Sequence, residues 1–477
     1  MAVVTDAGSE SDARPEGRAD DRAYDCAVIG AGFAGLSAAV RLAREGARVI
    51  VLEARSRLGG RATAFADRET GELVDNGQHV LFGCYVETLS FLCDIGALDH
   101  VRRQPQLSLM MIDRAGRVSR LECPRLPSPL HLIAGVLEWE ALTWTDRLSV
   151  LHMATPLRLA RRAIRDSASG AQKIAASPGE TVESWLIRNG QTARLREMLW
   201  EPLALAALNQ PATQAAAPLF ARVLAEMFGG DSSAASILLP TVPLDAMYAD
   251  PARRFIERRG GEVRTGTRAV VQLKGGAIGA VGAGREVLSV QAVIAAVPWF
   301  AFAELFEGDA GDLQPVIDRS RALASSPIVT VNLWFDRPVM DEPFVGLPGR
   351  SMQWVFNTRA GSGGDTSHLS LVSSGARLLT DRGNEDLIGV AYRELVEALP
   401  EAGQARLIRG AVIREPRATF SLAPGQPARP GTATPVRRLY LAGDWIDTGL
   451  PATIESAVRS GHRAAEAVIQ MTKRPHS

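Results

Sequence analysis

The sequence lacks the features of several large classes of protein. Its 53 acidic residues balance its 53 basic residues, which argues against a nucleic-acid-binding protein because such proteins normally carry a basic excess. Its four cysteines form no CxxC pair and have no zinc-like spacing with the seven histidines. We therefore expect no metal site, and buried thiols kept in a reducing compartment. No stretch reaches the ~18 uninterrupted apolar residues of a membrane span.

Residues 1–23 also lack the apolar core of a signal peptide. They mix acidic residues and arginines with small residues, so we expect a disordered tail and a cytoplasmic protein. The rest of the chain is typical of a folded globular protein, since 46% of all residues are apolar and 22% are charged. Its 477 residues exceed what one hydrophobic core usually serves, which favours two domains.

A glycine-rich turn near residue 30 has the context of a dinucleotide-binding site. The apolar run Cys26–Ile29 predicts a strand, Leu36–Arg44 predicts a helix, and Arg48–Leu52 predicts the next strand. Between the first strand and the helix stands Gly30-Ala31-Gly32-Phe33-Ala34-Gly35, which matches the GxGxxG pattern. The strand, turn, helix and strand together favour a ligand site over a glycine-rich turn that binds nothing.

Each glycine of this turn has its own physical role. Gly30 permits the tight turn, Gly32 lets the backbone approach a pyrophosphate, and Gly35 packs the helix on the strand. The phosphates would lie at the helix N-terminus, where unpaired N–H groups favour anions. Glu53 would accept hydrogen bonds from ribose hydroxyls and would repel a 2′-phosphate, so we do not expect NADP. The turn residues predicted to bind the cofactor are Gly30, Gly32, Phe33, Ala34 and Gly35.

The stretch that follows identifies the dinucleotide by resemblance. Glu53-Ala54-Arg55-Ser56-Arg57-Leu58-Gly59-Gly60-Arg61 resembles the second phosphate-contacting stretch of the glutathione-reductase-like FAD enzymes, in their amine oxidase and phytoene desaturase branch. The resemblance implies that the arginines flank the pyrophosphate and that the glycine pair passes close to the flavin. Two glycines allow close backbone approach, and the arginines add charged donors. The implied FAD contacts here are Glu53, Ala54, Arg55, Arg57, Gly59, Gly60 and Arg61.

A C-terminal segment resembles the third FAD-binding stretch of the same branch. Arg438–Ala442 predicts a strand, Gly443 and Asp444 follow it, and a further helix runs through Val458 and Ala465. The resemblance implies that Asp444 binds the ribityl or pyrophosphate part of FAD. It also implies that the N-terminus of the later helix faces the O2 edge of the flavin, where negative charge gathers on reduction. The residues assigned to that helix start are Ala452, Thr453 and Ile454.

The fold class implied is α/β, with a discontinuous Rossmann-like FAD-binding domain of glutathione-reductase type and an interleaved α+β substrate domain. We assign residues 24–83, 240–298 and 412–472 to the FAD-binding domain, and residues 84–239 and 299–411 to the substrate domain. Residues 262–273 alternate like one strand, in which the resemblance implies an adenine contact at Ala269 or Val270, and we select Val270. In the substrate domain the spacing predicts helices over 85–95, 130–137, 146–165, 181–188, 192–208 and 384–398, and strands over 328–335 and 368–373.

Two further stretches are more particular than the FAD motifs. Asp75-Asn76-Gly77-Gln78-His79-Val80 and Leu199-Trp200-Glu201-Pro202-Leu203, continued by Ala206-Ala207-Leu208-Asn209, resemble the hydroxysqualene dehydroxylases, also described as squalene-associated FAD-dependent desaturases. The resemblance runs from about residue 24 to 470. It implies that reduced FAD replaces the hydroxyl group of hydroxysqualene with hydrogen, giving squalene in bacterial hopanoid biosynthesis. One departure is Ala204, which stands where that family's helix leads us to expect a cysteine.

That reaction needs a proton donor, and four side chains are candidates. A carboxylic acid or imidazole buried against hydrocarbon can acquire a pKa suited to general acid work. Each candidate also has a purely structural interpretation: a turn residue, a core histidine or a salt-bridged helix residue. The candidates are His79, Glu201, Asp75 and Asp447.

The helical part of the substrate domain also suits contact with a membrane surface. Residues 126–165 are rich in leucine and tryptophan and end in arginines, which fits an interfacial segment and fits an ordinary core helix equally well. A long isoprenoid substrate, a bound reductase as electron donor and a peripheral position on the inner face of the cytoplasmic membrane follow as expectations.

We consider three alternatives to this function. A carotenoid desaturase would use the same FAD site in the oxidative direction. An FAD-bound scaffold would use it without catalysis. An amine oxidase is disfavoured because residues 329–335, where such enzymes usually have a lysine, contain none, and the chain has only three lysines.

Overall fold

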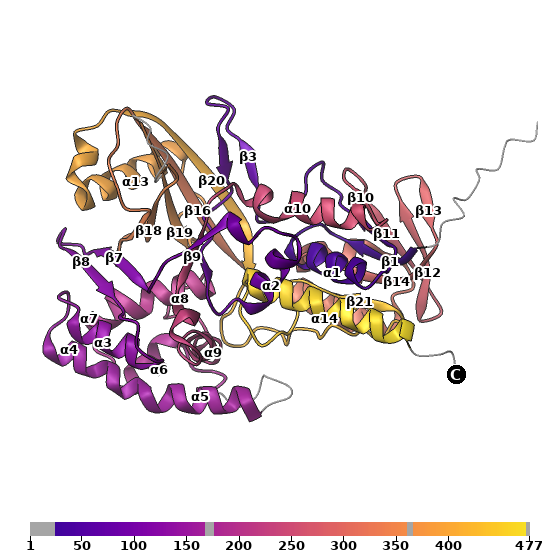
Figure 1. The fold of residues 1–477 in the computed structure, drawn as a ribbon, viewed down its shortest axis with the longest axis horizontal. Coiled ribbons are helices and arrows are strands. Elements are labelled where there is room, and N and C mark those ends of the chain that lie inside the picture. Colours follow the sequence, from indigo (N-terminus) through magenta and orange to yellow (C-terminus); the bar gives the residue numbers. More distant parts are fainter. Residues whose placement is uncertain (1–23, 167–175, 360–365, 474–477) are drawn as a thin grey trace, which may run out of the picture.

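The computed structural model describes residues 24–166, 176–359 and 366–473. The predicted tail 1–23 lies outside the described residues. The first architectural unit is a parallel sheet of five strands, whose segments come from both ends and the middle of the chain (Figure 1). Its spatial order is β10 (Glu262–Arg264), β2 (Val49–Leu52), β1 (Tyr24–Ile29), β14 (Val290–Ala295) and β21 (Leu439–Leu441). This confirms the predicted α/β fold class and its discontinuous Rossmann-like sheet.

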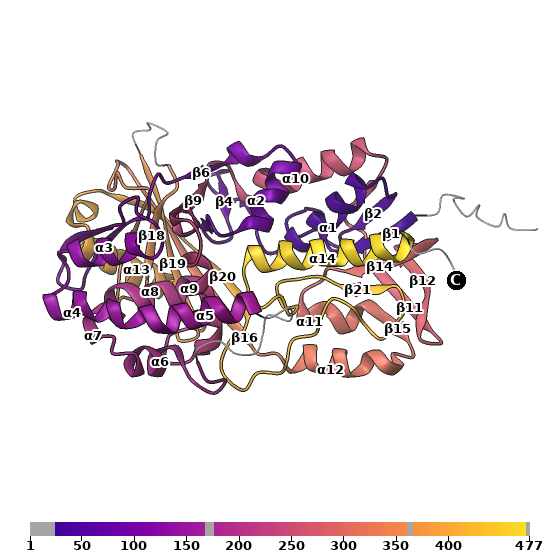
Figure 2. The same ribbon diagram turned by 60° about the horizontal axis from the view of Figure 1, so that its bottom comes forward.

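Alternate residues of these strands build two separate layers of core, as expected for a parallel sheet covered on both faces. Cys26 and Val28 pack with one set of helices, whereas Ala27 and Ile29 face the opposite side. The helices on the first face are α1 (Phe33–Arg44), α2 (Val86–Asp94), α10 (Leu244–Arg258) and α14 (Ile454–Lys473) (Figure 2). Against the second face lie β11 (Ala269–Lys274), β12 (Ala277–Ala283), β13 (Glu286–Leu288), β15 (Phe306–Gly308), α11 (Trp299–Phe302) and α12 (Gln314–Ala322).

The single strand predicted over 262–273 is wrong. The chain forms β10 in the parallel sheet, leaves it at Arg264, and re-enters a different, four-stranded sheet as β11. Between them, Gly266 has φ +64 and donates its N–H to the carbonyl of Arg55, and the N–H of Thr267 donates to the carbonyl of Glu53. This turn is therefore hydrogen-bonded to the segment that follows β2. It separates two short strands, β10 and β11, in each of which buried and more exposed side chains alternate.

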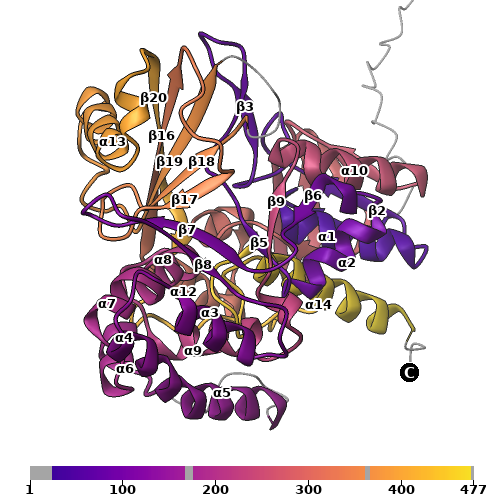
Figure 3. The ribbon, with the colours of Figure 1, turned by 60° about the vertical axis from the view of Figure 1, so that its left-hand side comes forward.

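A seven-stranded sheet forms the core of the second unit. Its order is β20 (Leu407–Phe420), β16 (Ser325–Phe335), β19 (Ser367–Ser374), β18 (Trp354–Asn357), β17 (Phe344–Gly346), β7 (Ser108–Ile112) and β8 (Val118–Glu122). The predicted strands 328–335 and 368–373 are confirmed, and so is the helix 384–398, which is α13 (Asn384–Ala398) and covers one face of this sheet (Figure 3). The hairpin of β7 and β8 was not predicted.

The predicted domain boundary at residue 412 needs correction, because it cuts through β20. This strand pairs with β16 from Leu407 opposite Phe335 to Phe420 opposite Ser325. By its hydrogen bonding, β20 therefore belongs with the seven-stranded sheet, and the C-terminal return to the parallel sheet begins after residue 420.

Helices gather beneath the open face of the seven-stranded sheet (Figure 3). They are α3 (Leu130–Glu138), α4 (Trp144–Ser149), α5 (Ala154–Asp166), α6 (Val182–Arg188), α7 (Ala193–Leu195), α8 (Glu201–Leu208) and α9 (Ala217–Met227). The helix predicted over 146–165 is divided by a 3₁₀ turn, Val150–Met153, and that over 192–208 contains a π-helical segment, Arg196–Trp200. Two small sheets join the units: β3 (Ala64–Ala66) with β4 (Leu73–Asp75), and β5 (Leu81–Phe82) with β9 (Ile237–Pro240) and β6 (Val101–Arg103).

Candidate active site

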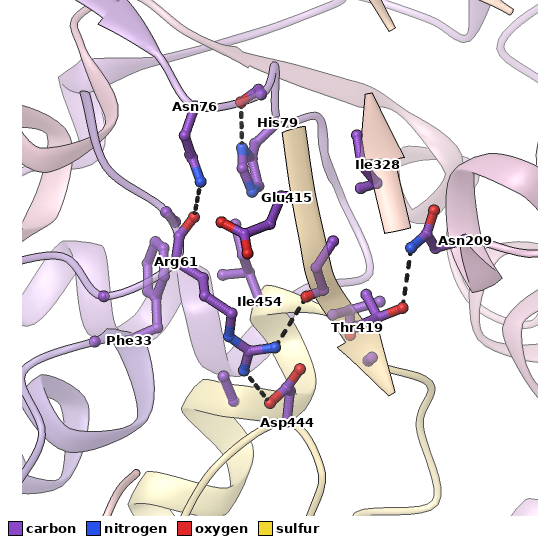
Figure 4. Close-up of a pocket in the computed structure, with 18 of the residues that line it drawn as sticks. Phe33, Arg61, Asn76, His79, Asn209, Ile328, Glu415, Thr419, Asp444 and Ile454 are labelled. Carbon is purple, nitrogen blue, oxygen red and sulfur yellow. Dashed lines mark hydrogen bonds and ion pairs between the residues drawn. The ribbon is translucent and has the colours of Figure 1, made fainter. Parts of the chain in front are cut away.

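A cavity of about 670 Å³ lies where the two units meet. Its polar end is formed by the turn after β1, the segment after β2 and the start of α14. Its other end reaches the open face of the seven-stranded sheet and the helices below it. Figure 4 shows the junction of these ends, with side chains from all of these elements entering one space.

Packing explains two of the three glycines in the turn before α1. Gly30 has φ +107, and a Cβ atom there would stand 2.5 Å from the carbonyl oxygen of Ala296. A Cβ on Gly35 would stand 1.8 Å from the carbonyl oxygen of Gly30. Both glycines are therefore needed to bring the helix against the sheet, and Gly35 does not line the cavity.

Gly32 is different, because no protein atom requires its bare backbone. Its φ of −86 suits any residue, and a Cβ there would meet nothing nearer than the Cα of Gly60, at 3.8 Å. Its neighbours Ala31, Phe33 and Ala34 also line the cavity. The N-terminus of α1 has no side-chain cap and no acidic residue in its first turn. The first N–H groups of this helix are therefore uncapped, and Gly32 places no side chain between them and the cavity. This arrangement fits a bound phosphate group.

Glu53 ends β2 and lines the same part of the cavity. Its Oε2 atom accepts the N–H of Ala31 at 2.9 Å, and its Oε1 atom accepts the N–H of Arg55 at 2.9 Å. A carboxylate has about four acceptor positions, so these bonds leave capacity for ribose hydroxyls. Ala54 and Arg55 also line the cavity, but Arg57 does not: it is exposed, with its guanidinium 5.8 Å from the ring of Phe65.

Arg61 joins three distant parts of the chain. Its guanidinium pairs with Asp444 at 2.5 Å and donates to the carbonyl of Ala418 at 2.9 Å. It also lies 5.3 Å from the ring of Trp299. Just before it, Gly59 and Gly60 have φ +102 and +61, so the glycine pair is required by the backbone. Asp444 is buried, and its pairing with Arg61 holds both side chains at the cavity wall.

The C-terminal segment reaches the cavity as predicted. Gly443 has φ +147, and the start of α14 lines the cavity through Ala452, Thr453 and Ile454. On the opposite side Ala269 lines the cavity, whereas Val270 does not. The selection of Val270 over Ala269 is therefore not supported by the cavity. Together the uncapped helix, the free backbone at Gly32 and the remaining acceptor positions of Glu53 fit a dinucleotide in this cradle.

Of the four candidate proton donors, only His79 lines the cavity. Its Nδ1 atom lies 2.7 Å from the carbonyl oxygen of Gly77, and burial lowers its pKa. Because a carbonyl can only accept, Nδ1 carries the hydrogen and the neutral ring leaves Nε2 as an acceptor. In this form His79 can hold a hydroxyl group in place through Nε2, which carries no proton to donate, because the N–H at Nδ1 is bonded to Gly77.

The other three candidates have structural roles. Asp75 accepts the N–H of Leu244 at the start of α10, 3.1 Å away, and burial raises its pKa to about 6. Glu201 accepts the N–H of Ala212 at 3.1 Å, and burial raises its pKa. Asp447 is exposed and lies 3.4 Å from the guanidinium of Arg429. None of the three lines the cavity, so the cavity does not support their selection as catalytic residues.

A group of polar residues around Glu415 was not predicted from the sequence. The ladder between β16 and β20 is irregular between Ser326 and Ile328, where Pro327 and Pro416 remove backbone donors from the two strands. Asn209, at the end of α8, donates to the carbonyl of Ser326 at 3.1 Å and to Thr419 Oγ1 at 3.0 Å. The irregularity turns Glu415 and Thr419 toward the cavity (Figure 4). A proline inside a strand pattern was the available signal.

The far end of the cavity is lined by hydrocarbon. The seven-stranded sheet and the helices below it contribute Ile328, Phe344, Trp354, Phe356, Val372, Leu132, Met198, Leu199, Leu203, Met227 and Phe228. An apolar chamber that opens onto a dinucleotide cradle suits a redox reaction on a long hydrocarbon substrate.

Known proteins are similar to this chain over almost its whole length. The family model for flavin-containing amine oxidoreductases matches residues 33–469. A hydroxysqualene dehydroxylase of Sinorhizobium fredii is 31% identical, covering 93% of this chain and 98% of the relative, and one of Rhodopseudomonas palustris is 31% identical, covering 93% and 97%. A 15-cis-phytoene desaturase of Capsicum annuum is 27% identical, covering 93% and 77%. Cyclohexylamine oxidase from Brevibacterium oxydans has a similar structure, with a TM-score of 0.71, 15% identity, and coverage of 95% of this chain and 100% of that one.

Proposed function

The chain belongs to the flavin-containing amine oxidoreductase family, and on this premise we propose that it is the FAD-dependent oxidoreductase that reduces hydroxysqualene to squalene. The observation that carries the proposal is the continuity of the polar cradle with the apolar chamber, in a chain similar to a hydroxysqualene dehydroxylase over 93% of its length. A substrate with one hydroxyl group on a long hydrocarbon would place that group at the junction and its chain in the chamber.

The cradle residues would hold FAD in the order of the sequence motifs. The N–H groups of α1 behind Gly32 would bind the pyrophosphate, and Glu53 would accept the ribose hydroxyls. Arg61 and Asp444 would flank the middle of the cofactor, and the start of α14 at Ile454 would face the flavin. Bound and reduced, FAD supplies a hydride to an electron-poor carbon.

The chain's own side chains prepare the substrate. The apolar chamber excludes water, so that a carbon cation is not captured by solvent. Neutral His79 would accept a hydrogen bond from the substrate hydroxyl through Nε2 and fix its position at the junction. Burial lowers the pKa of His79, which favours the neutral ring that can accept that bond.

Peripheral contact with the inner face of the cytoplasmic membrane is a second part of the proposal. Trp144, Leu148 and Leu151 are 68%, 51% and 43% exposed on neighbouring turns of the helical layer. On α3, which contacts α4, Leu130 is 53% exposed while Leu132 lines the cavity, so this helix lies between the exposed surface and the chamber. Among the described residues, no helix is long and apolar enough to cross a bilayer. A hydrocarbon substrate could pass from lipid into the chamber beside this surface.

Anaerobic single turnover tests the reaction. The purified protein is photoreduced, mixed with hydroxysqualene, and followed by its visible spectrum while the lipid is extracted. Reoxidation of the flavin with one squalene formed per flavin is the expected result. Persistent reduced flavin with unchanged alcohol would refute the proposal.

Electrons in the cell would come from a bound reductase, which a pull-down followed by flavin reduction with nicotinamide nucleotide would identify.

Vesicle sedimentation tests the membrane contact separately. The replacement of Trp144, Leu148 and Leu151 by serine should abolish binding to vesicles that contain anionic phospholipid, and single-turnover activity in detergent should stay unchanged. Equal sedimentation of both proteins would refute the assignment of this surface.

A phytoene-type desaturase is a second candidate, favoured by the similarity to 15-cis-phytoene desaturases. The same protein, with oxidised flavin and phytoene, should leave the polyene unchanged if the first proposal is correct. Anaerobic flavin reduction by phytoene would favour the second candidate.

A further inference from the structure

We propose that Glu415 is the general acid that protonates the leaving hydroxyl group, an inference that rests on the proposed function. Four acidic residues of the described chain line the cavity: Glu53, Glu304, Glu415 and Asp444. Only a carboxyl group near the junction of cradle and chamber can reach a hydroxyl placed there, so the position and partners of each residue decide between them.

Three of the four acids are unsuitable. Glu53 accepts two backbone N–H groups beside the turn after β1, at the dinucleotide end. Asp444 is paired with Arg61 at 2.5 Å, so its carboxyl group is already engaged in the cradle. Glu304 is 74% exposed, and its nearest basic partner is Arg268, 4.0 Å away, next to the cavity wall at Ala269.

Glu415 differs from these three acids in its apolar strand neighbour and in the lack of a partner for its carboxyl group within the described residues. Its strand neighbour across the ladder is Ile328, an apolar lining residue of the chamber. Within the described residues, its carboxyl group has no hydrogen-bond or ion-pair partner, since Arg61 is directed to Asp444 and the carbonyl of Ala418. Figure 4 shows Glu415 entering the same space as His79 and Arg61. An uncommitted carboxyl group at the boundary of polar and apolar walls is available for proton transfer.

The position of Glu415 is built into the fold. The break in the ladder at Pro327 and Pro416 frees this part of β20 from regular pairing. Asn209 then fixes both sides of the break through Ser326 and Thr419, so the strand does not close over the gap. A bulge of this kind re-aims side chains next to active sites.

The chemistry balances with these groups. The carboxyl proton of Glu415 passes to the substrate hydroxyl oxygen, the C–O bond breaks, and its electron pair leaves with water. The allylic carbon keeps a delocalised positive charge beside the new carboxylate of Glu415, and it accepts the hydride that the proposed function already requires. The products are the hydrocarbon, water and ionised Glu415, which recovers its proton from solvent after the hydrocarbon leaves. His79 accepts from the hydroxyl through Nε2 before the bond breaks.

The test compares Glu415→Gln with the matched control Glu304→Gln and the conservative variant Glu415→Asp, all as FAD-loaded proteins. Single-turnover reoxidation of photoreduced protein by hydroxysqualene should slow about 100-fold or more in Glu415→Gln, with the half-saturating concentration of hydroxysqualene little changed. Glu304→Gln should match the wild type, and Glu415→Asp should recover part of the rate.

A binding measurement on the oxidised proteins gives a readout independent of turnover. The probe is a C30 isoprenoid amine whose ammonium group stands in for the carbon cation. It should bind Glu415→Gln about tenfold or more weakly than the wild type, because a charged hydrogen bond is lost. The flavin spectrum and its content per chain should be equal in all four proteins.

The outcomes distinguish a failure of the proposed function from a failure of the role proposed for Glu415. Wild-type protein that forms no squalene refutes the proposed function and this inference with it. Wild-type turnover with an undiminished rate in Glu415→Gln, or equal binding of the amine by both proteins, refutes only the role of Glu415.

Discussion

Asp75 is the carboxyl group whose replacement should change the pH dependence of stability most clearly. It is half-buried at the start of α10, where it accepts the N–H of Leu244 at 3.1 Å. Burial raises its pKa from 3.8 to about 6, against the opposing effect of that hydrogen bond, and the nearby charge of Asp245 raises it further. The variant Asp75→Asn keeps an acceptor oxygen for Leu244 and cannot ionise.

The sign of this pH dependence follows from whether Asp75 binds its proton more tightly in the folded or in the unfolded protein. With a raised pKa, the folded protein holds the proton of Asp75 at pH values where the unfolded chain has lost it. The stabilisation is therefore complete below about pH 4 and is lost as the pH rises through about 6. A shift of about 2 pKa units corresponds to about 3 kcal/mol at 1.36 kcal/mol per unit. The unfolding free energy of Asp75→Asn minus that of the wild type should rise by about that amount between pH 4 and pH 7.5.

Urea unfolding, followed by tryptophan fluorescence at several pH values, measures this difference. Asp67→Asn is the matched control with the opposite sign. Burial alone would raise the pKa of Asp67, but hydrogen bonds from Thr70 and Arg409 outweigh it and lower the pKa to about 2. That variant should lose relative stability as the pH rises from about 2 to about 4, and its difference from the wild type should change little between pH 4 and pH 7.5. A difference for Asp75→Asn that is flat with pH, or that falls as pH rises, would refute the assigned environment.

Three further predictions concern the cradle and the junction. Gly32→Ala should fold with wild-type thermal stability as apoprotein but bind FAD at least tenfold more weakly, whereas Gly35→Ala should lower the melting temperature of the apoprotein, since its Cβ would stand 1.8 Å from a carbonyl oxygen. Equal melting temperatures for the two would contradict the packing argument. Arg61→Ala should lose FAD on gel filtration and Arg57→Ala should retain it, measured by absorbance at 450 nm. Loss of FAD from both variants would show that Arg57 also contributes to FAD binding. Asn209→Ala removes three side-chain hydrogen bonds, one buried and two partly buried, and should cost roughly 3 kcal/mol in urea unfolding; an effect below about 1 kcal/mol would show that the break in the ladder does not depend on Asn209.

Much of the cofactor cradle could be predicted because its signals are local. The turn around Gly30 needs a tight bend and a helix start within a few consecutive residues, so the pattern itself states the geometry. The same holds for the backbone at Gly59 and Gly60, whose positive φ angles only glycine adopts easily. The long helix 384–398 was predictable for a similar reason, since a repeated spacing over fifteen residues has few other structural explanations.

The errors share a different cause. Residues 262–273 alternate as a strand would, but the turn at Gly266 is stabilised by carbonyl groups of residues 53 and 55, some two hundred positions away. The boundary at 412 failed because a strand's sheet is decided by its partner, and β20 pairs with β16. Arg57 and Arg61 are alike in the motif, yet only Arg61 finds Asp444 and Ala418 across the fold.

The sequence by itself determined that a dinucleotide cradle forms from both ends of the chain, because glycine placement and strand–turn–helix order are properties of neighbouring residues. Only the tertiary structure decided which acids line the cavity. Asp75, Glu201 and Asp447 stand in distinctive motifs, but backbone N–H groups or an arginine at the periphery engage them. Glu415 stands in no motif, and it reaches the cavity because two strands lose their pairing at Pro327 and Pro416. The direction of a side chain at such a break depends on contacts between residues far apart in sequence, which no local pattern records.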